Sequence, residues 1–328
     1  MFLEPDDYLI LMNIPLYSGI GKPIRLVGDD IKRLRDVGIK TVLEYPWWDA
    51  IEHTFGQRDY RMIEDFIVNA RQGGMKVVMP VPTIASQGLP REWYCHFRSE
   101  HPHMERTSLW QPGAVQYERE YLLDLVTRFS ASDVIFVYSG YLTGESVLNN
   151  APCYFDSGAM AEQQALGLVN VDVTTNPEAK EWLRMSILRH YKGVQDILRK
   201  QHNEIWDAHQ WCIAQQSLHN GNFAQEDWLK DWRQSWPDVS IVLLQYTCFA
   251  HNEPYPTFVK NLMDEVGLRV IVEADYCRGV KVTSRVAKEE RGYHGNVIGP
   301  VHPWAGETEL KPWMVDTIRE VIEYWGKE

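Results

Sequence analysis

The chain has 328 residues, of which 45% are hydrophobic and 24% are charged, and its formal net charge is −12. This length fits one large α/β barrel or two average domains, and the composition is ordinary for a soluble globular protein. A negative field of this size repels nucleic acid and anionic membranes, so we exclude both as partners, whereas a neutral substrate is compatible with it.

Short runs rich in β-forming residues alternate with longer amphipathic runs along the whole chain. In chain order, the expected strand–helix pairs are Tyr8–Tyr17 with Val27–Val37, Thr41–Tyr45 with Arg61–Gln72, Lys76–Pro82 with Tyr117–Phe129, Val134–Tyr138 with Glu178–Arg199, Ile205–Trp211 with Gln225–Trp236, Val239–Tyr246 with Thr257–Val266, Arg269–Ala274 with Val282–Glu290, and Asn296–Val301 with Pro312–Tyr324. Eight such pairs without a break in composition predict an α/β fold, a single-domain (β/α)8 TIM barrel over residues 1–328. An open doubly wound sheet is the second possibility, but Ser18–Gly21 matches its glycine-rich phosphate loop only weakly.

Two connections in this pattern are unusually long. One runs from Thr83 to Gln116 after the third strand, and the other from Ser146 to Pro177 after the fourth strand. Both follow a strand, so both are expected at the C-terminal face of the barrel, where long loops commonly build the functional site.

The cysteines and the N-terminus indicate the compartment. The five cysteines form no CxxC pair, which is typical of reduced thiols. Residues 1–7 hold no basic region followed by an apolar run, and no apolar run reaches the length of a membrane span. We therefore expect a cytoplasmic protein without a membrane segment.

Aromatic residues and isolated carboxylates gather where the predicted strands end, and the chain holds 13 Trp and 16 Tyr. Catalytic and binding groups of barrel enzymes come from the ends of different strands. Sugars suit this mixture, because their C–H faces stack on indole rings and their hydroxyls bond carboxylates and amides. The candidate substrate-binding residues are Glu44, Trp47, Trp48, Tyr141, His209, Trp211, Gln245, Tyr246, Tyr276, His302 and Trp304.

Two glutamates are the candidates for catalysis. Glu145 follows the fourth strand and Glu273 lies inside an apolar run on the seventh, so the two would face each other across the barrel mouth. Glycoside hydrolysis needs two carboxylates on opposite sides of the scissile bond, one of them protonated near neutral pH. Other roles stay open: a solvated loop position for Glu145, and a structural salt bridge inside the barrel for Glu273.

The neighbouring candidates also have structural alternatives. Trp47 and Trp48 could pack in the core, although adjacent strand positions point to opposite faces, so at most one of them would normally do so. Glu44, Asp49 and Glu52 could equally be structural.

Three segments resemble barrel glycoside hydrolases of the β-galactosidase and β-amylase kinds. They are the stretch from Tyr45 to Tyr60, with its W-x-x-x-E-x-x-x-G pattern, then Gly74-Met75-Lys76-Val77, and Leu89-Pro90-x-x-Trp93. The run Trp47-Trp48-x-x-Ile51-Glu52 is most similar to β-amylase, and Gly144-Glu145 is closer to the G-E-L-R of that family than to the N-E of the larger retaining clan.

This resemblance implies a glycosidase acting on a carbohydrate substrate without a cofactor or metal, in carbohydrate metabolism such as polysaccharide degradation. Glu145 would protonate the glycosidic oxygen, while Glu273 would attack the anomeric carbon, giving retention, or activate water, giving inversion. The placement of the pair after strands four and seven favours retention. Tyr246 and Trp304 match an aromatic on strand six and a tryptophan that closes strand eight.

Two other functions remain open from the residues. A carbohydrate-binding barrel without catalysis would use the same tryptophans. A metal-dependent hydrolase or lyase would use Asp207, His209 and His302, although no HExxH spacing supports it and the H-x-H of His101 and His103 lies in the first long connection. A serine hydrolase lacks its GxSxG motif.

Overall fold

The computed structural model of the chain describes residues 9–13, 28–44, 51–81, 88–96, 102–129, 134–138, 155–169, 171, 175–199, 205–208, 239–244, 265, 269–274, 295–301 and 312–325. Within these residues, no helix is both long and apolar enough to cross a membrane.

Eight strands close into one barrel, and each strand pairs in parallel with both of its neighbours. In order around the barrel they are β1 (Leu9–Asn13), β2 (Thr41–Glu44), β3 (Lys76–Val81), β6 (Val134–Tyr138), β7 (Ile205–Ala208), β8 (Val239–Leu244), β9 (Arg269–Ala274) and β10 (Gly295–Val301). This order is the chain order, so β6 is the fourth barrel strand and β9 is the seventh, as predicted from the sequence.

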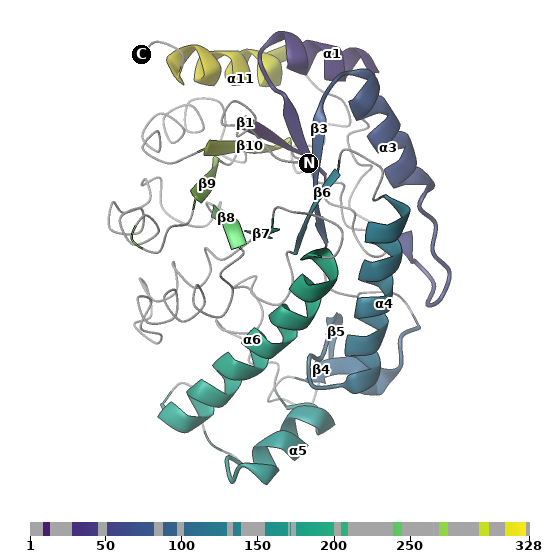
Figure 1. The fold of residues 1–328 in the computed structure, drawn as a ribbon, viewed down its shortest axis with the longest axis vertical. Helices are drawn as coiled ribbons and strands as arrows, with labels where there is room; N and C mark the ends of the chain where they lie inside the picture. Colours follow the sequence, from purple (N-terminus) through teal and green to yellow (C-terminus); the bar gives the residue numbers. More distant parts are fainter. Residues whose placement is uncertain are drawn as a thin grey trace.

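Helices follow the barrel strands wherever the connections are described (Figure 1). They are α1 (Gly28–Asp36), α3 (Arg61–Gln72), α4 (Pro112–Arg128), α5 (Ser157–Ala165), α6 (Pro177–Arg199) and α11 (Pro312–Trp325). The predicted helices Gln225–Trp236, Thr257–Val266 and Val282–Glu290 lie outside the described residues, apart from the helical Glu265. The strand–helix alternation therefore holds over the first half of the chain and at its end, and the single-domain boundary stays a prediction.

Helix α3 illustrates why the sequence folds as it does. Its apolar residues recur at helical spacing, and Ile63, Phe66 and Ile67 are buried. The helix ends at Gly73-Gly74, where Gly74 adopts a φ of +68°, a conformation that favours glycine. Gly73 also lets α3 approach α1, because a Cβ placed there would lie 2.0 Å from a methyl carbon of Ile31.

The last helix of the chain lies near the first helix. Figure 1 shows α11 beside α1, and the side chain of Ile322 on α11 lies 3.4 Å from where a Cβ of Gly38, just after α1, would be. The core lies between strands and helices, where Val42, Val78 and Val134 are at most 1% exposed.

The two long connections are more ordered than the sequence indicated. The first contains the short helix η2 (Arg91–Trp93), an antiparallel pair formed by β4 (Tyr94–His96) and β5 (Pro102–Thr107), and the first turn of α4. The predicted helix start at Tyr117 is therefore wrong, since α4 begins at Pro112, a residue well suited to a first helical turn. The second connection contains α5.

Candidate functional site

The carboxyl ends of the parallel strands meet at one end of the barrel, where the sequence predicts the site. Glu44 is the last residue of β2 and is aligned with Asn13 of β1. Glu273 is the second-last residue of β9 and is aligned with Val297 of β10. The backbone of both predicted residues thus lies at the ends of strands that belong to one closed barrel.

The other predicted site residues lie outside the described residues: Trp47, Trp48, Tyr141, Glu145, His209, Trp211, Gln245, Tyr246, Tyr276, His302 and Trp304. Their positions in the chain still relate them to the barrel. Gln245 directly follows the last residue of β8, and Glu145 comes seven residues after Tyr138, the last residue of β6. Their place in a common site stays a prediction.

The segment after β2, residues 51–60, is held in place by a buried carboxylate. Glu52 is fully buried, and its Oε2 accepts a hydrogen bond of 2.8 Å from Nε of Arg58. Its Oε1 accepts from the hydroxyl of Tyr117 at 2.8 Å and from the backbone N–H of Gly56 at 3.1 Å. Gly56 turns the chain with a φ of +79°. Of the two roles that the sequence left open for Glu52, the structure shows the structural one.

A second carboxylate extends this cluster to helix α4. Asp124 accepts a hydrogen bond of 2.6 Å from the hydroxyl of Tyr60 and lies 3.4 Å from Nη1 of Arg58. The guanidinium of Arg58 also lies over the rings of Tyr117 and Tyr121, at 5.0 and 5.3 Å from their centroids. Arg58 therefore connects the segment after β2 to one face of α4.

Three tyrosines of this cluster are expected to ionise late in an alkaline titration. Burial, together with the hydrogen bond to Asp124, raises the pKa of Tyr60. Burial also raises the pKa of Tyr117, aided by Glu52, and of Tyr121, which is fully buried. An unfolded tyrosine ionises near pH 10. Because the folded pKa lies above that value, the free energy of unfolding should fall as pH rises above about 10.

Absorbance at 295 nm, recorded with circular dichroism, checks this expectation. Phenolate formation should occur in two steps, and the second step should coincide with unfolding. The Tyr121→Phe protein should show a smaller second step and an unchanged first one. A single step near pH 10 with an intact circular dichroism spectrum would contradict it.

Two of the three segments that carry the family resemblance pack on each other, through Phe55 and Trp93. The ring of Phe55 lies 5.6 Å from that of Trp93, edge to face, and 4.8 Å from that of Tyr117. Trp93 and Tyr117 lie 5.7 Å apart. Such aromatic pairs stabilise beyond their buried area. The segment after β2 and the first long connection thus form one packed unit with α4.

Asp156 joins the two long connections. It is 1% exposed and is the N-cap of α5, with its Oδ1 accepting from the backbone N–H groups of Gly158 and Ala159. The hydroxyl of Ser108 donates to its Oδ2 at 2.7 Å, and Nε2 of Gln111 donates to Oδ1 at 3.0 Å. The connections after the third and fourth strands therefore act as a single structural element.

Gly158 lets α5 approach the first connection closely, so we expect Gly158→Ala to destabilise the protein. A Cβ at this position would lie 2.3 Å from the carbonyl oxygen of Trp110, and backbone atoms cannot move aside cheaply. We expect a loss of roughly 1–3 kcal/mol in the free energy of unfolding. Urea unfolding measures it. The exposed Gly167→Ala is the contrast: nothing lies within 4 Å of its new Cβ, and only its φ of +72° opposes the side chain, at a cost of about 1 kcal/mol.

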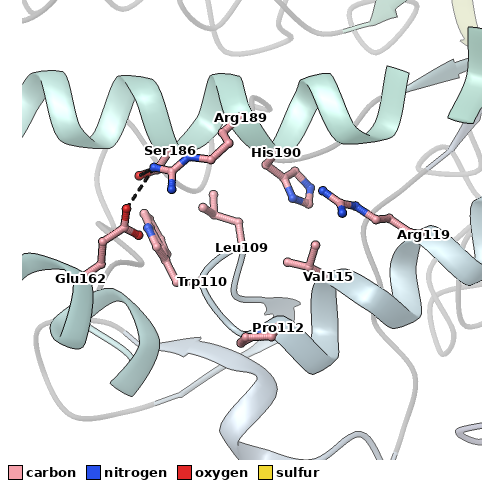
Figure 2. Close-up of a pocket in the computed structure, with 9 residues that line it drawn as sticks. All are labelled: Leu109, Trp110, Pro112, Val115, Arg119, Glu162, Ser186, Arg189 and His190. Atoms are coloured by element: carbon pink, nitrogen blue, oxygen red, sulfur yellow. Dashed lines mark hydrogen bonds and ion pairs between the residues drawn. The ribbon is translucent and has the colours of Figure 1, made fainter. Parts of the chain in front are cut away.

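A pocket of about 260 Å³ lies between α4, α5 and α6 (Figure 2). Arginine and histidine side chains reach it from both sides, Arg119 from α4 and Arg189 with His190 from α6. Leu109 and Trp110, from the end of the first long connection, form its apolar part, and Trp110 stacks on Trp182 of α6 at 5.2 Å. The sequence did not predict this pocket, because its residues come together only when the helices pack.

Within the described part of the chain, no group of three or more His, Cys, Asp or Glu side chains could hold a metal ion. Of the residues proposed for a metal site, Asp207 lies in β7, whereas His209 and His302 lie outside the described residues.

Comparisons with known proteins agree with the barrel. No family model and no curated protein matches the sequence. Among solved structures, the catalytic domain of β-amylase from Paenibacillus polymyxa superposes with a TM-score of 0.66 and 12% identity, over 97% of this chain and 98% of that one. A β-galactosidase from the psychrophilic Marinomonas ef1 superposes with a TM-score of 0.65 and 11% identity, over 96% of this chain and 59% of that one. At these identities the likeness establishes a shared fold.

Proposed function

We propose that the protein is a glycoside hydrolase that cleaves an O-glycosidic bond at the carboxyl end of the barrel, with Glu145 as the general acid/base and Glu273 as the nucleophile. The observation that carries the proposal is the strand count, since β6 and β9 are the fourth and seventh strands of one closed barrel. Glu145 follows β6 in the chain and the backbone of Glu273 lies in β9.

Two further observations support the substrate class. The two solved structures compared above are named as a β-amylase and a β-galactosidase, and the likeness to the β-amylase catalytic domain spans almost the whole of both chains. The candidate binding residues are mostly aromatic and amide or carboxylate groups, which suit the C–H faces and hydroxyls of a sugar. The net charge of −12 is compatible with a neutral oligosaccharide or polysaccharide.

The chemistry follows from two carboxyl groups on opposite sides of a glycosidic bond. Protonated Glu145 would donate its proton to the leaving oxygen while the carboxylate of Glu273 bonds to the anomeric carbon. Water, deprotonated by Glu145, would then release the sugar with its configuration retained. A carboxyl separation of about 5–5.5 Å belongs to this route, and one of about 6.5–9.5 Å to inversion through an activated water.

A panel of nitrophenyl glycosides with the intact protein tests the proposal. Release of nitrophenol from at least one sugar is expected, and proton NMR of the first-formed product should show the anomer of the substrate. Formation of the opposite anomer would show that the enzyme inverts the configuration instead of retaining it. Binding of sugars without any turnover across the panel would instead identify a carbohydrate-binding barrel.

A further inference from the structure

We propose that the pocket between α4, α5 and α6 binds a small molecule that carries an oxyanion, either a carboxylate or a phosphate, on a sugar-sized body. The pocket holds about 260 Å³, which is room for one such molecule. It is built by helices of the outer layer and by the end of the first long connection, and none of its lining residues belongs to a barrel strand or to the set proposed for hydrolysis.

The balance of charges around the pocket points to an anion. Arg189 pairs with Glu162 of α5 at 3.0 Å, and Nε2 of His190 lies 2.9 Å from Oε2 of the buried Glu118. Neither of these two contacts includes Arg119, although Arg119 lines the same pocket. Figure 2 shows its guanidinium and the imidazole of His190 extending toward each other from α4 and α6.

Arg119 is also short of hydrogen-bond acceptors. Its Nε is buried and has no acceptor within the part of the chain that the structure describes, and the same is true of the indole N–H of Trp110. A buried donor without an acceptor is costly, and a cation without a counter-ion more so. An oxyanion in the pocket would supply the acceptor, since the guanidinium fork matches carboxylate and phosphate oxygens equally well.

The rest of the pocket suits the body of the ligand. Leu109, Val115 and the ring of Trp110 offer an apolar surface, and Trp110 is held rigid by its stack on Trp182. The hydroxyl of Ser186 adds a polar group on the α6 side. A bare inorganic ion would leave the apolar part unused, so a molecule with a body should bind more tightly than inorganic phosphate.

Binding can be measured by isothermal titration at constant ionic strength with four probes: glucose, glucuronate, glucose 6-phosphate and inorganic phosphate. Glucose, glucuronate and glucose 6-phosphate share the sugar ring, and glucose 6-phosphate shares its anionic group with inorganic phosphate. The comparison therefore shows whether the pocket prefers a carboxylate or a phosphate, and how much the ring adds to the affinity. We expect glucuronate or glucose 6-phosphate to bind more tightly than inorganic phosphate, and we expect no Arg119-dependent binding of glucose. The outcome does not depend on glycoside hydrolysis, so the proposed function can fail while this proposal stands, and the reverse.

Two variants assign the binding to this pocket. Arg119→Met removes the charge and should weaken the preferred anion at least about tenfold, as expected for loss of a charge-assisted hydrogen bond. Gly193→Ala keeps the charge but displaces it, because a Cβ on Gly193 of α6 would lie 2.1 Å from Nη2 of Arg119. Alanine favours the helix, so this variant should fold and still bind more weakly.

Arg61→Met is the matched control, since Arg61 is an exposed arginine on α3 that pairs with Asp59. It should bind like the unmodified protein. Equal binding of the anions to all four proteins, or no binding of glucuronate, glucose 6-phosphate and phosphate at millimolar concentrations, would overturn the proposal.

Discussion

Replacing Glu273 or Glu145 with glutamine should abolish most of the glycosidase activity while leaving the fold intact. Removal of a general acid costs about 10²–10⁴-fold in rate, and we expect that loss in kcat for Glu145→Gln on a nitrophenyl glycoside. Glu273→Gln should lose at least as much, because no covalent intermediate forms without the carboxylate. Initial rates and circular dichroism of the same preparations measure both effects.

The leaving group separates the two roles. A dinitrophenyl glycoside needs little protonation, so Glu145→Gln should regain much of its first step on that substrate, whereas Glu273→Gln should not. Added azide should rescue Glu145→Ala by giving a glycosyl azide with retained configuration, and Glu273→Ala by giving the inverted one. Glu320→Gln, an exposed position on α11, is the control and should keep full activity. Full activity in both folded site variants would refute the assignment.

The barrel could be predicted because its order comes from local patterns. Helix α3 has the predicted bounds, since its apolar spacing is strong and the Gly73-Gly74 pair stops it. Strands β6 and β9 also coincide with their predicted ranges, because each is a short run rich in β-branched residues. Parallel strands that alternate with helices then leave few ways to arrange the chain.

The long connections could not be predicted, because tertiary contacts decide them. The start of α4 includes Gly113, a poor helix former, and is packed so closely on Trp93 that a Cβ would lie 2.7 Å from its indole nitrogen. Strands β4 and β5 are short and carry charged residues and a proline, without the alternation typical of a strand. Two local patterns could have been recognised: the Asp156 N-cap, an aspartate directly before α5, and Pro112 in the first turn of α4.

The role of Glu52 was open for a related reason. A glutamate near a strand end is as consistent with a functional site as with a structural salt bridge. The contacts that decide between them come from α4, more than sixty residues away: Tyr117 donates to Glu52, and Asp124 pairs with Arg58, the partner of Glu52. The sequence pattern indicated that the segment after β2 belongs to the functional region, and the structure shows that Glu52 holds this segment in its conformation. Trp47, Trp48 and Asp49 precede this fixed segment directly, so its stability bears on the proposed site.

Removing Glu52 should be among the most destabilising changes in the described part of the chain. In Glu52→Ala, the guanidinium of Arg58 loses its buried partner and the hydroxyl of Tyr117 loses its acceptor. The N–H of Gly56 loses one of its two acceptors and keeps the hydroxyl oxygen of Tyr117. Breaking a buried ion pair from one side costs about 3–5 kcal/mol. Because the Arg58 side chain is 18% exposed and can recruit water, we expect the lower part of that range, near 3 kcal/mol.

Urea unfolding measures this loss, and an exposed ion pair between α3 and α4 provides its control. Arg128 and Glu64 join α4 to α3 at 3.0 Å, but both side chains are more than 40% exposed, so Glu64→Ala should cost under about 1 kcal/mol. The double variant Glu52→Ala with Arg58→Met should be less destabilised than the sum of its single changes, because it leaves no buried charge unpaired. Asp124 also loses Arg58, but its side chain is 42% exposed and keeps the hydrogen bond from Tyr60. Equal losses for Glu52→Ala and Glu64→Ala would mean that water replaces the partners of Arg58, and that the segment after β2 is held by its aromatic contacts alone.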